Sequence, residues 1–237
     1  NHKNQNNPVY SGIGLMNKKI LKFRNKKIFN LEKDLFPILI KNKKIKYEIF
    51  DKEFLDIGVP EDLNRAKKFI EKSEMRPSAF LDRDGVINVD HGYVHSINNF
   101  NWKTGVKKAI KYLNNNNFYV FVITNQSGIG RGYYNKKDVE QLHLYISKEL
   151  KKCEAHIDDF VYAPYFKQSK TFSSRYHKSL RKPNSGMIDL LQKKWNIDFK
   201  NSFLIGDQES DIKLAKKKKL VFHKIKPNEN LFNVVKK

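Results

Sequence analysis

Short apolar runs bounded by polar residues recur from about residue 78 to the C-terminus. They occupy residues 79–81, 118–123, 160–162, 202–205 and 220–222. Short, largely apolar runs of this kind are typical of strands that are buried on both faces of a parallel sheet. The pattern therefore predicts five such strands.

Helical periodicity fills the intervals between these strands. Val106, Ala109, Ile110 and Leu113 follow the i, i+3, i+4, i+7 spacing of an amphipathic helix. Further helices are predicted over residues 139–150 and 187–195. Strands that alternate with helices predict an α/β fold, a doubly wound parallel sheet with right-handed crossovers.

The chain changes character at residues 71–77, a polar stretch that ends in Pro77. Such a stretch between two differently patterned segments is typical of a domain boundary. We therefore expect one domain at residues 1–74 and a second at residues 75–237.

The composition allows a folded protein: of the 237 residues, 39% are hydrophobic and 13% aromatic, which suffices for a buried core. No run reaches the roughly 18 consecutive apolar residues that a membrane-spanning helix requires, so no membrane partner is expected. The polar N-terminus has neither an apolar signal core nor an initiator Met. These features favour a cytoplasmic protein and leave a longer native chain open.

The single cysteine, Cys153, can form neither an intrachain disulfide nor a cysteine-rich zinc site. The formal net charge of +22 invites a nucleic-acid partner. However, Lys and Arg are spread over the whole chain, and the one dense run, residues 216–219, is typical of a solvated helix end before a buried strand. The charge distribution therefore favours a small anionic substrate over a nucleic acid.

Polar residues that can carry chemistry follow the predicted strands. Asp82 and Asp84 come after the first strand, Thr124 after the second and Asp207 after the fourth, with Lys182 between the third and the fourth. In open α/β sheets, ligands bind beyond the C-terminal ends of the strands. Carboxylates, a hydroxyl group and a lysine at one such edge can hold a divalent cation and a phosphoryl group together.

Each of these features alone has a simpler interpretation. An Asp-x-Asp-Gly tetrad is common in surface turns, and Asp207 and Asp211 could cap a helix and occupy its first turn. A calcium-binding EF-hand loop is excluded, because Ile87 and Tyr93 occupy its required Gly and Glu positions. The order of the residues at successive strand ends is what favours phosphoryl chemistry.

Four motifs, at residues 82–85, 123–125, 182 and 206–211, resemble those of the haloacid-dehalogenase-like phosphatases. Over about residues 78–225 the chain resembles more narrowly the D,D-heptose 1,7-bisphosphate phosphatases, chiefly at 80–94, 124–132 and 181–187. The same motifs resemble the histidinol-phosphate phosphatases, and the first two also resemble the polynucleotide 3′-phosphatases. An inactive scaffold module, retained by fusion, is a further alternative from a different class.

The heptose resemblance implies hydrolysis of the C7 phosphate of D-glycero-D-manno-heptose 1,7-bisphosphate through an aspartyl-phosphate. Asp82 would attack phosphorus, and Asp84 would act as general acid and then base. Thr124 and Lys182 would stabilise the phosphoryl oxygens, and Mg²⁺ would be held by the Asp82 carboxylate, the Asp84 backbone carbonyl and Asp207. The residues implied to bind the substrate are Asp90, His91, Gly92, Tyr93, Asn125, Gln126, Ser127 and Arg181.

The sequence departs from this family's pattern in two places. Residues 163–166, Ala-Pro-Tyr-Phe, stand where many members begin a zinc-binding loop with Cys-Pro-His, and Lys178 and Leu180 stand where two cysteines would follow. His177 alone cannot build a tetrahedral site, so no bound zinc is expected. Gln208 replaces a common Lys after the metal aspartate, which leaves its phosphate contact open.

The N-terminal part resembles a different family. Residues 11–17, 31–37 and 56–62 resemble the C-terminal third of sugar-phosphate nucleotidyltransferases, in which Asp56 would be a metal ligand. That family's Gly-rich nucleotide loop and its Lys are absent from this sequence, so we expect a small N-terminal α/β remnant. A nucleotidyltransferase fused to a heptose phosphatase would catalyse consecutive steps towards a nucleotide-activated heptose for lipopolysaccharide or capsule. The sequence leaves the sugar's anomer and the oligomeric state undetermined.

Overall fold

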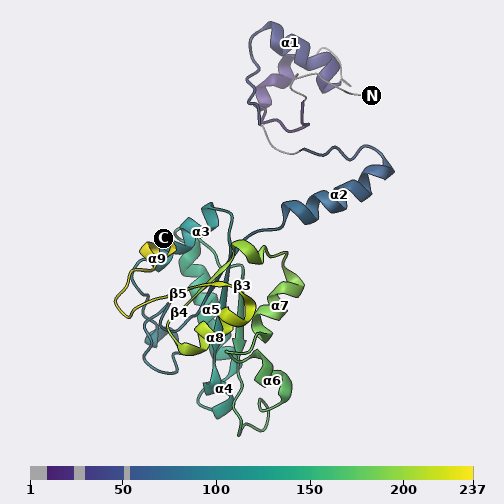
Figure 1. Cartoon of the computed structure of the whole chain (residues 1–237). Helices are drawn as coiled ribbons and strands as arrows, with labels where there is room; N and C mark the ends of the chain where they lie inside the picture. Colours follow the sequence, from purple (N-terminus) through teal and green to yellow (C-terminus); the bar gives the residue numbers. More distant parts are fainter. Residues whose placement is uncertain (1–9, 24–29, 51–53, 237) are drawn as a thin grey trace. The chain divides into compact units, whose positions relative to one another are not determined.

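The computed structural model describes residues 10–23, 30–50 and 54–236 (Figure 1). The chain divides into two compact units, residues 1–56 and 57–237. Helix α2 (Pro60–Ser73) belongs to the second unit. The boundary expected from the sequence, between residues 74 and 75, follows the end of α2.

The first unit consists of short helical turns: a 3-10 helix at Lys18–Phe23, a π-helical turn at Leu31–Leu35 and α1 at Phe36–Lys41. Asn30 begins the π-helical turn, because its side-chain oxygen accepts the N–H groups of Glu32 at 3.0 Å and Lys33 at 2.8 Å. Leu35 and Leu39 are buried beneath these turns. The described residues of this unit contain no strand, so the α/β character expected for the N-terminal part is not found among them.

The second unit is built on a five-stranded parallel sheet with the strand order β3-β2-β1-β4-β5. Leu81 at the end of the central strand pairs with Val122 on one side and Ile205 on the other. All five predicted strands and the doubly wound α/β fold are confirmed. The strands are β1 (Ser78–Leu81), β2 (Tyr119–Asn125), β3 (Asp159–Ala163), β4 (Phe203–Gly206) and β5 (Val221–Lys224).

Helices connect these strands, and the three predicted ones are present as α3, α5 and α7. The basic run at residues 216–219, expected to be a solvated helix end, lies at the end of α8. The short helices α4, α6 and α9 were not predicted, because they are too short to show a helical period in the sequence. In the described part of the chain, no helix is both long and apolar enough to cross a membrane. The helices after α2 are α3 (Val106–Asn115), α4 (Ser127–Arg131), α5 (Lys136–Lys151), α6 (Arg175–Leu180), α7 (Gly186–Lys194), α8 (Glu209–Lys218) and α9 (Leu231–Val235), with 3-10 turns at Ile97–Asn99 and Phe199–Asn201.

Neighbouring residues of β1 pack against different helical layers. Leu81 belongs to a core cluster with Ile110 of α3, whereas Phe80 belongs to a second cluster with Met187 of α7. This follows from the pleat of a strand, which points successive side chains to opposite faces. The sheet is therefore covered on both faces, as Figure 1 shows for the second unit.

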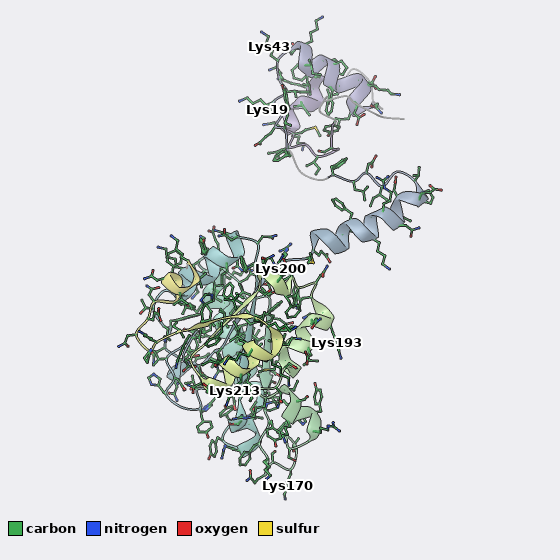
Figure 2. All side chains as sticks on the ribbon, viewed as in Figure 1. Lys19, Lys43, Lys170, Lys193, Lys200 and Lys213 are labelled. Carbon is green, nitrogen blue, oxygen red and sulfur yellow. The ribbon has the colours of Figure 1, made fainter. Side chains whose placement is uncertain are left out.

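Basic side chains are distributed over many elements (Figure 2). In the first unit, Lys19 and Lys43 lie on separate turns. In the second unit, Lys170 lies in the loop before α6, Lys193 on α7 and Lys213 on α8. The charge that the sequence spreads along the chain is thus also spread in space within each unit.

His143 of α5 lies in the core with little exposed surface, and its ring stacks on Phe160 with 4.4 Å between the ring centroids. Burial, together with the positive charge of Arg83, lowers its pKa from 6.5 to about 3. The neutral ring is therefore the folded form, whereas the unfolded chain protonates below pH ~6.5. The neutral His143 ring therefore contributes fully to the free energy of unfolding above pH ~6.5, and this contribution is lost as the pH falls towards 3.

We predict that His143→Phe flattens the acid limb of the stability curve. Between about pH 6.5 and 4.5 the slope of the unfolding free energy should fall by up to about 1.4 kcal/mol per pH unit, because one proton uptake on unfolding is removed. Denaturant unfolding at several pH values measures this. His91→Phe is the control, since His91 is exposed and its ring nitrogen lies 3.2 Å from the uncharged Asn101 side chain. An unchanged slope in His143→Phe would contradict the prediction.

Candidate active site

The acidic residues of the sequence motifs meet at the C-terminal edge of the sheet. Asp82 directly follows β1, and its N–H donates to the carbonyl of Ile205 in β4 at 3.0 Å. Asp207 follows β4, and Asp211 lies in the first turn of α8. One carboxylate oxygen from each of Asp82, Asp207 and Asp211 lies within 4.8 Å of the others. Parallel strands place their ends at the same edge, which is why residues so distant in the sequence converge.

Lys182 joins this cluster from the loop between α6 and α7. Its Nζ lies 2.7 Å from Asp82 Oδ2 and 2.7 Å from Asp211 Oδ1. All three side chains are buried. Asn125 fixes the lysine backbone, because its Oδ1 accepts the Lys182 N–H at 2.9 Å and its Nδ2 donates to the Lys182 carbonyl at 3.3 Å. The end of β2 thus positions the lysine beside the end of β1.

Burial governs the protonation of this cluster. It raises the pKa of Asp82 to about 7, with Lys182 opposing the rise and Asp211 adding to it. Burial would lower the pKa of Lys182, but the charges of Asp82 and Asp211 outweigh it and raise that pKa. Burial also raises the pKa of Asp207. Three carboxylates around one lysine leave an excess of negative charge, which favours a bound cation.

The geometry around Asp207 fits a divalent cation with oxygen ligands. Asp207 Oδ1 is buried, and no hydrogen-bond partner for it occurs among the described residues. Its Oδ2 accepts from Gln208 Nε2 at 2.8 Å. Gly85 (φ +81°) leaves the room for this carboxylate, since a Cβ there would lie 2.4 Å from Asp207 Oδ2. Carboxylate oxygens are the ligands that Mg²⁺ prefers, so Asp82 and Asp207 are suited to hold it.

Asp84 lies in a separate network of hydrogen bonds. The Arg83 guanidinium is fully buried and donates from Nη2 to Asp84 Oδ1 at 2.9 Å and to Oδ2 at 3.0 Å. Asn88 Nδ2 donates to Oδ1 at 3.0 Å, and Gln126 Nε2 donates to Oδ2 at 2.9 Å. Gln126 Nε2 also donates to Thr124 Oγ1 at 2.9 Å. Asp84 and Thr124, predicted from separate motifs, are thereby linked.

The residues implied to bind the substrate fall into two groups. Asp90, His91, Gly92 and Tyr93 form an exposed loop after β1, where Asp90 accepts the Gly92 N–H at 2.8 Å. Asn125 and Gln126 instead make hydrogen bonds inside the site, as described above. Ser127 begins α4 and is half-buried.

Arg181 is half-buried beside this site, and its Nη1 has no hydrogen-bond partner among the described residues. Burial lowers its pKa, and the nearby charge of Arg131 lowers it further. Arg131 in turn lies over the Phe166 ring, 4.0 Å from the centroid. Two guanidinium groups therefore lie close together near the strand ends, where an anion would relieve their repulsion.

Sequence reasoning missed several residues of the site. Arg83 stands between the two aspartates of the first motif. Its position as a charged residue directly after a buried strand could have marked it as a residue of the site. Lys103 gave no such indication, yet its Nζ donates to the carbonyls of Gly85 at 2.8 Å and Lys226 at 3.1 Å. Asn88 and Tyr134 were also missed, because each lies outside the motifs and its contact with Asp84 or Gln126 forms only in the folded loops.

The loop without zinc ligands forms its own contacts. His177 Nδ1 lies 2.8 Å from Ser174 Oγ, and its ring packs edge-on to Phe172 at 5.2 Å. Within the described ranges, Asp82, Asp207 and Asp211 form the one group of three or more His, Cys, Asp or Glu residues that could hold a metal ion.

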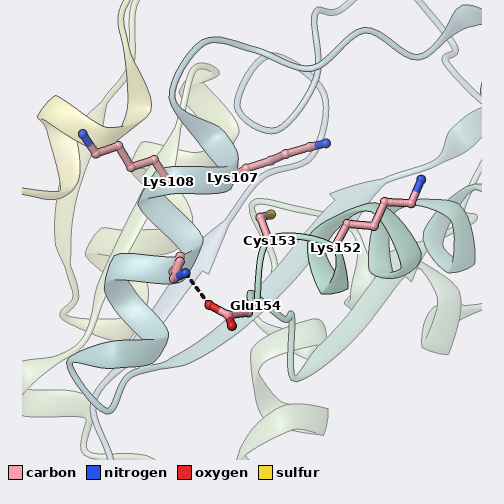
Figure 3. Close-up of a pocket in the computed structure, with 6 residues that line it drawn as sticks. Lys107, Lys108, Lys152, Cys153 and Glu154 are labelled. Atoms are coloured by element: carbon pink, nitrogen blue, oxygen red, sulfur yellow. Dashed lines mark hydrogen bonds and ion pairs between the residues drawn. The ribbon is translucent and has the colours of Figure 1, made fainter.

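A basic cavity lies elsewhere in the second unit (Figure 3). It has a volume of about 470 Å³ and is lined by Lys107, Lys108 and Lys111 of α3 and by residues 152–154 after α5. Glu154 pairs with Lys111 at 2.7 Å, as the dashed line in Figure 3 marks. Residues 152–154 precede β3, whereas the acidic cluster follows the ends of β1 and β4. This cavity is therefore separate from the candidate active site.

Comparisons with known proteins agree with this geometry. The chain is 44% identical over 141 residues to a D-glycero-beta-D-manno-heptose-1,7-bisphosphate 7-phosphatase of Rhodopseudomonas palustris, across 60% of this chain and 78% of the relative. It is 38% identical over 133 residues to a D-glycero-alpha-D-manno-heptose-1,7-bisphosphate 7-phosphatase of Campylobacter jejuni, across 56% and 72%.

Among solved structures, the fold resembles D,D-heptose 1,7-bisphosphate phosphatase from B. bronchiseptica, complexed with magnesium and phosphate. The TM-score is 0.55 at 24% identity, over 62% of this chain and 78% of that chain. Residues 79–225 match the family described as polynucleotide kinase 3 phosphatase, which is more than half of the chain. With the strand-end aspartates in place, the chain belongs to this phosphatase family.

Proposed function

We propose that this chain is a Mg²⁺-dependent phosphatase that removes the C7 phosphate of D-glycero-D-manno-heptose 1,7-bisphosphate. The observation that carries the proposal is the buried Asp82 carboxylate, 2.7 Å from Lys182 Nζ and beside Asp207 at the strand ends. Similarity to relatives from two organisms that are named for this substrate supports the substrate class.

The proposed reaction has two steps. An Asp82 oxygen attacks phosphorus, the bond between phosphorus and the C7 oxygen breaks, and Asp84 gives that oxygen a proton. A water molecule then attacks the phosphorus of the aspartyl-phosphate, and Asp84 accepts a proton from that water. The bond between phosphorus and the Asp82 oxygen breaks, which releases inorganic phosphate and restores the Asp82 carboxylate. Lys182 and the Thr124 hydroxyl stabilise the negative charge on the phosphoryl oxygens. Asp82, Asp207 and the Asp84 carbonyl would hold Mg²⁺, which would supply further neutralisation of that charge.

The remaining implied residues are proposed to recognise the sugar and its second phosphate. Arg181 is the proposed contact for the part of the substrate remote from C7, because its half-buried guanidinium lies near the strand ends. The exposed loop from Asp90 to Tyr93 and Ser127 of α4 are proposed to line the sugar. On this proposal the protein acts on a small phosphorylated sugar in the cytoplasm.

We further propose that residues 1–74 are the C-terminal fragment of a nucleotidyltransferase-like domain, followed by the phosphatase at residues 75–237. The support is the resemblance at residues 11–17, 31–37 and 56–62. Together the two parts would serve consecutive steps towards a nucleotide-activated heptose for a surface polysaccharide.

Replacement of the nucleophile tests the mechanism. Asp82→Asn should lower kcat by about 10³-fold or more, because an amide cannot form the acyl-phosphate. Phosphate release from the heptose bisphosphate measures kcat, and circular dichroism checks the fold. Asp198→Asn is the matched control, since Asp198 lies before β4 at the opposite end of the sheet. A folded Asp82→Asn protein with near-normal turnover would exclude the mechanism.

Gly85→Ala tests the cation site. The new Cβ would lie 2.4 Å from Asp207 Oδ2, so the Mg²⁺ concentration for half-maximal activity should rise about 10-fold or more. Calorimetric titration with Mg²⁺ alone gives a second readout. Gly132→Ala is the control, because Gly132 has φ +78° but no atom within 4 Å of a Cβ there. Equal Mg²⁺ affinities in the two variants would contradict the assignment of Asp207.

A polynucleotide 3′-phosphatase is the second candidate function, favoured by the family match and by the net charge of +22. The salt dependence of substrate binding distinguishes the two candidate functions. Polynucleotide binding through about six or more phosphate contacts should weaken by about 10³-fold or more between about 50 and 200 mM salt. A bisphosphate held by buried charges is screened much less.

We therefore predict a shallow salt dependence of kcat/KM for heptose bisphosphate and feeble activity on a 3′-phosphorylated oligonucleotide. The same panel should include histidinol phosphate, which the site would process slowly. Efficient, steeply salt-dependent hydrolysis of the oligonucleotide would overturn the heptose assignment. Faster turnover of histidinol phosphate would do so as well.

A further inference from the structure

A buried chain of hydrogen bonds leads away from Asp84 to a tyrosine outside the sequence motifs. Tyr134, in the segment between α4 and α5, donates from its hydroxyl to Gln126 Oε1 at 2.7 Å. Gln126 is 1% exposed, and its Nε2 donates to Asp84 Oδ2 and to Thr124 Oγ1, each at 2.9 Å. Both sides of the Gln126 amide are therefore occupied inside the protein.

The partners fix which way this amide points. The Asp84 carboxyl oxygens already accept from Arg83 Nη2 and Asn88 Nδ2, and the Gln126 NH₂ group faces them as a further donor. The Gln126 carbonyl oxygen then faces Tyr134, whose hydroxyl must donate. Burial raises the Tyr134 pKa to about 12, so the donor proton is retained at neutral pH. Tyr134 thus stabilises the one amide orientation that serves Asp84.

The same orientation determines the donor direction of Thr124. The Thr124 hydroxyl oxygen accepts a hydrogen bond from Gln126 Nε2, so its own O–H is directed elsewhere. The end of β2, where Thr124 lies, is also where the proposed phosphoryl group would bind. A flipped amide would compete for that O–H, and it would bring its carbonyl oxygen against the Asp84 carboxylate.

Packing holds the Tyr134 ring itself in place. Gly128 lies against it so closely that a Cβ there would be 2.1 Å from Tyr134 Cε1. The His95 ring stacks on the Tyr134 ring, with 4.6 Å between centroids and 7° between planes. Tyr134 is 8% exposed, so the hydroxyl points inward from a fixed ring.

We propose that Tyr134 is a positioning residue that acts through Gln126 on both Asp84 and Thr124. This rests on the proposed phosphatase function and deepens it. It also assigns Gln126 to the support of the catalytic groups instead of to the substrate, because both of its N–H donors are already used. Tyr134 has no contact with the substrate in this assignment.

Tyr134→Phe removes the hydroxyl and keeps the ring that packs on Gly128 and His95. We expect kcat for heptose 1,7-bisphosphate to fall about 3- to 10-fold, the range that corresponds to the loss of one hydrogen bond. KM should stay within about twofold, because substrate contacts are untouched. An unchanged kcat would overturn the proposal, and so would an effect on KM alone.

Tyr119→Phe is the matched control. Tyr119 is also buried, and its hydroxyl donates to the Glu74 carbonyl at 2.8 Å. It begins β2, whereas the site follows the end of that strand, about 20 Å away at the rise of a β-strand. Tyr119→Phe should lower stability but leave kcat unchanged, so a general loss of stability cannot mimic the effect of Tyr134→Phe.

A double-mutant cycle tests the route through Gln126. In a Gln126→Met background, Tyr134→Phe should have no further effect on kcat, since its partner is gone. Effects that multiply would show that Tyr134 acts by another route. Denaturant unfolding of the same four proteins should also show coupling between the two residues, and additive stability changes would contradict the link.

The two proposals fail in different ways. If wild-type protein releases no phosphate from heptose bisphosphate or from p-nitrophenyl phosphate, the proposed function fails, while the unfolding cycle still decides whether Tyr134 anchors Gln126. If wild-type protein is active and Tyr134→Phe is equally active, only the inference about Tyr134 fails.

Discussion

The ion pairs of Lys182 with Asp82 and Asp211, each 2.7 Å long, are the interaction on which the site depends. All three charged groups are buried, and removal of one partner from such a group costs about 3 to 5 kcal/mol because the other charge stays buried. The cluster holds the nucleophile candidate at the end of β1 and the lysine at a fixed distance from it. It can form only if three separate chain segments arrive at one edge of the sheet.

The parallel sheet brings these three chain segments to one edge. β1 is central, with β2 on one side and β4 on the other, so the residues after three neighbouring strands share one edge. Asn125 then clamps the backbone of Lys182 from the end of β2. Because both faces of the sheet are covered by helices, this edge is where polar groups can meet without breaking the apolar core.

The two aspartates of the first motif have different surroundings, and this suits the different roles proposed for them. Asp82 faces Lys182, Asp207 and Asp211, where charge compensation decides its behaviour. Asp84 is held by directional hydrogen bonds from Arg83, Asn88 and Gln126. Asp82 thus pairs with Lys182 and Asp84 with Arg83 and two amide donors, although only Arg83 lies between the two aspartates in the sequence.

The sequence by itself determined the five strands, the longer helices and the order of the motif residues, because apolar periodicity and strand-end position are local properties. It could not determine which other residues hold these motif residues in place by hydrogen bonds. Tyr134 meets Gln126, Lys103 meets the Gly85 loop and Asn125 meets Lys182 only in the folded chain. These contacts join residues that are 8 to 57 positions apart in the sequence or that lie in different loops. The hydrophobic periodicity of the sequence therefore gives no sign of them. Their partners are chosen by the packing of the tertiary structure, which alone decides which buried donor faces which acceptor.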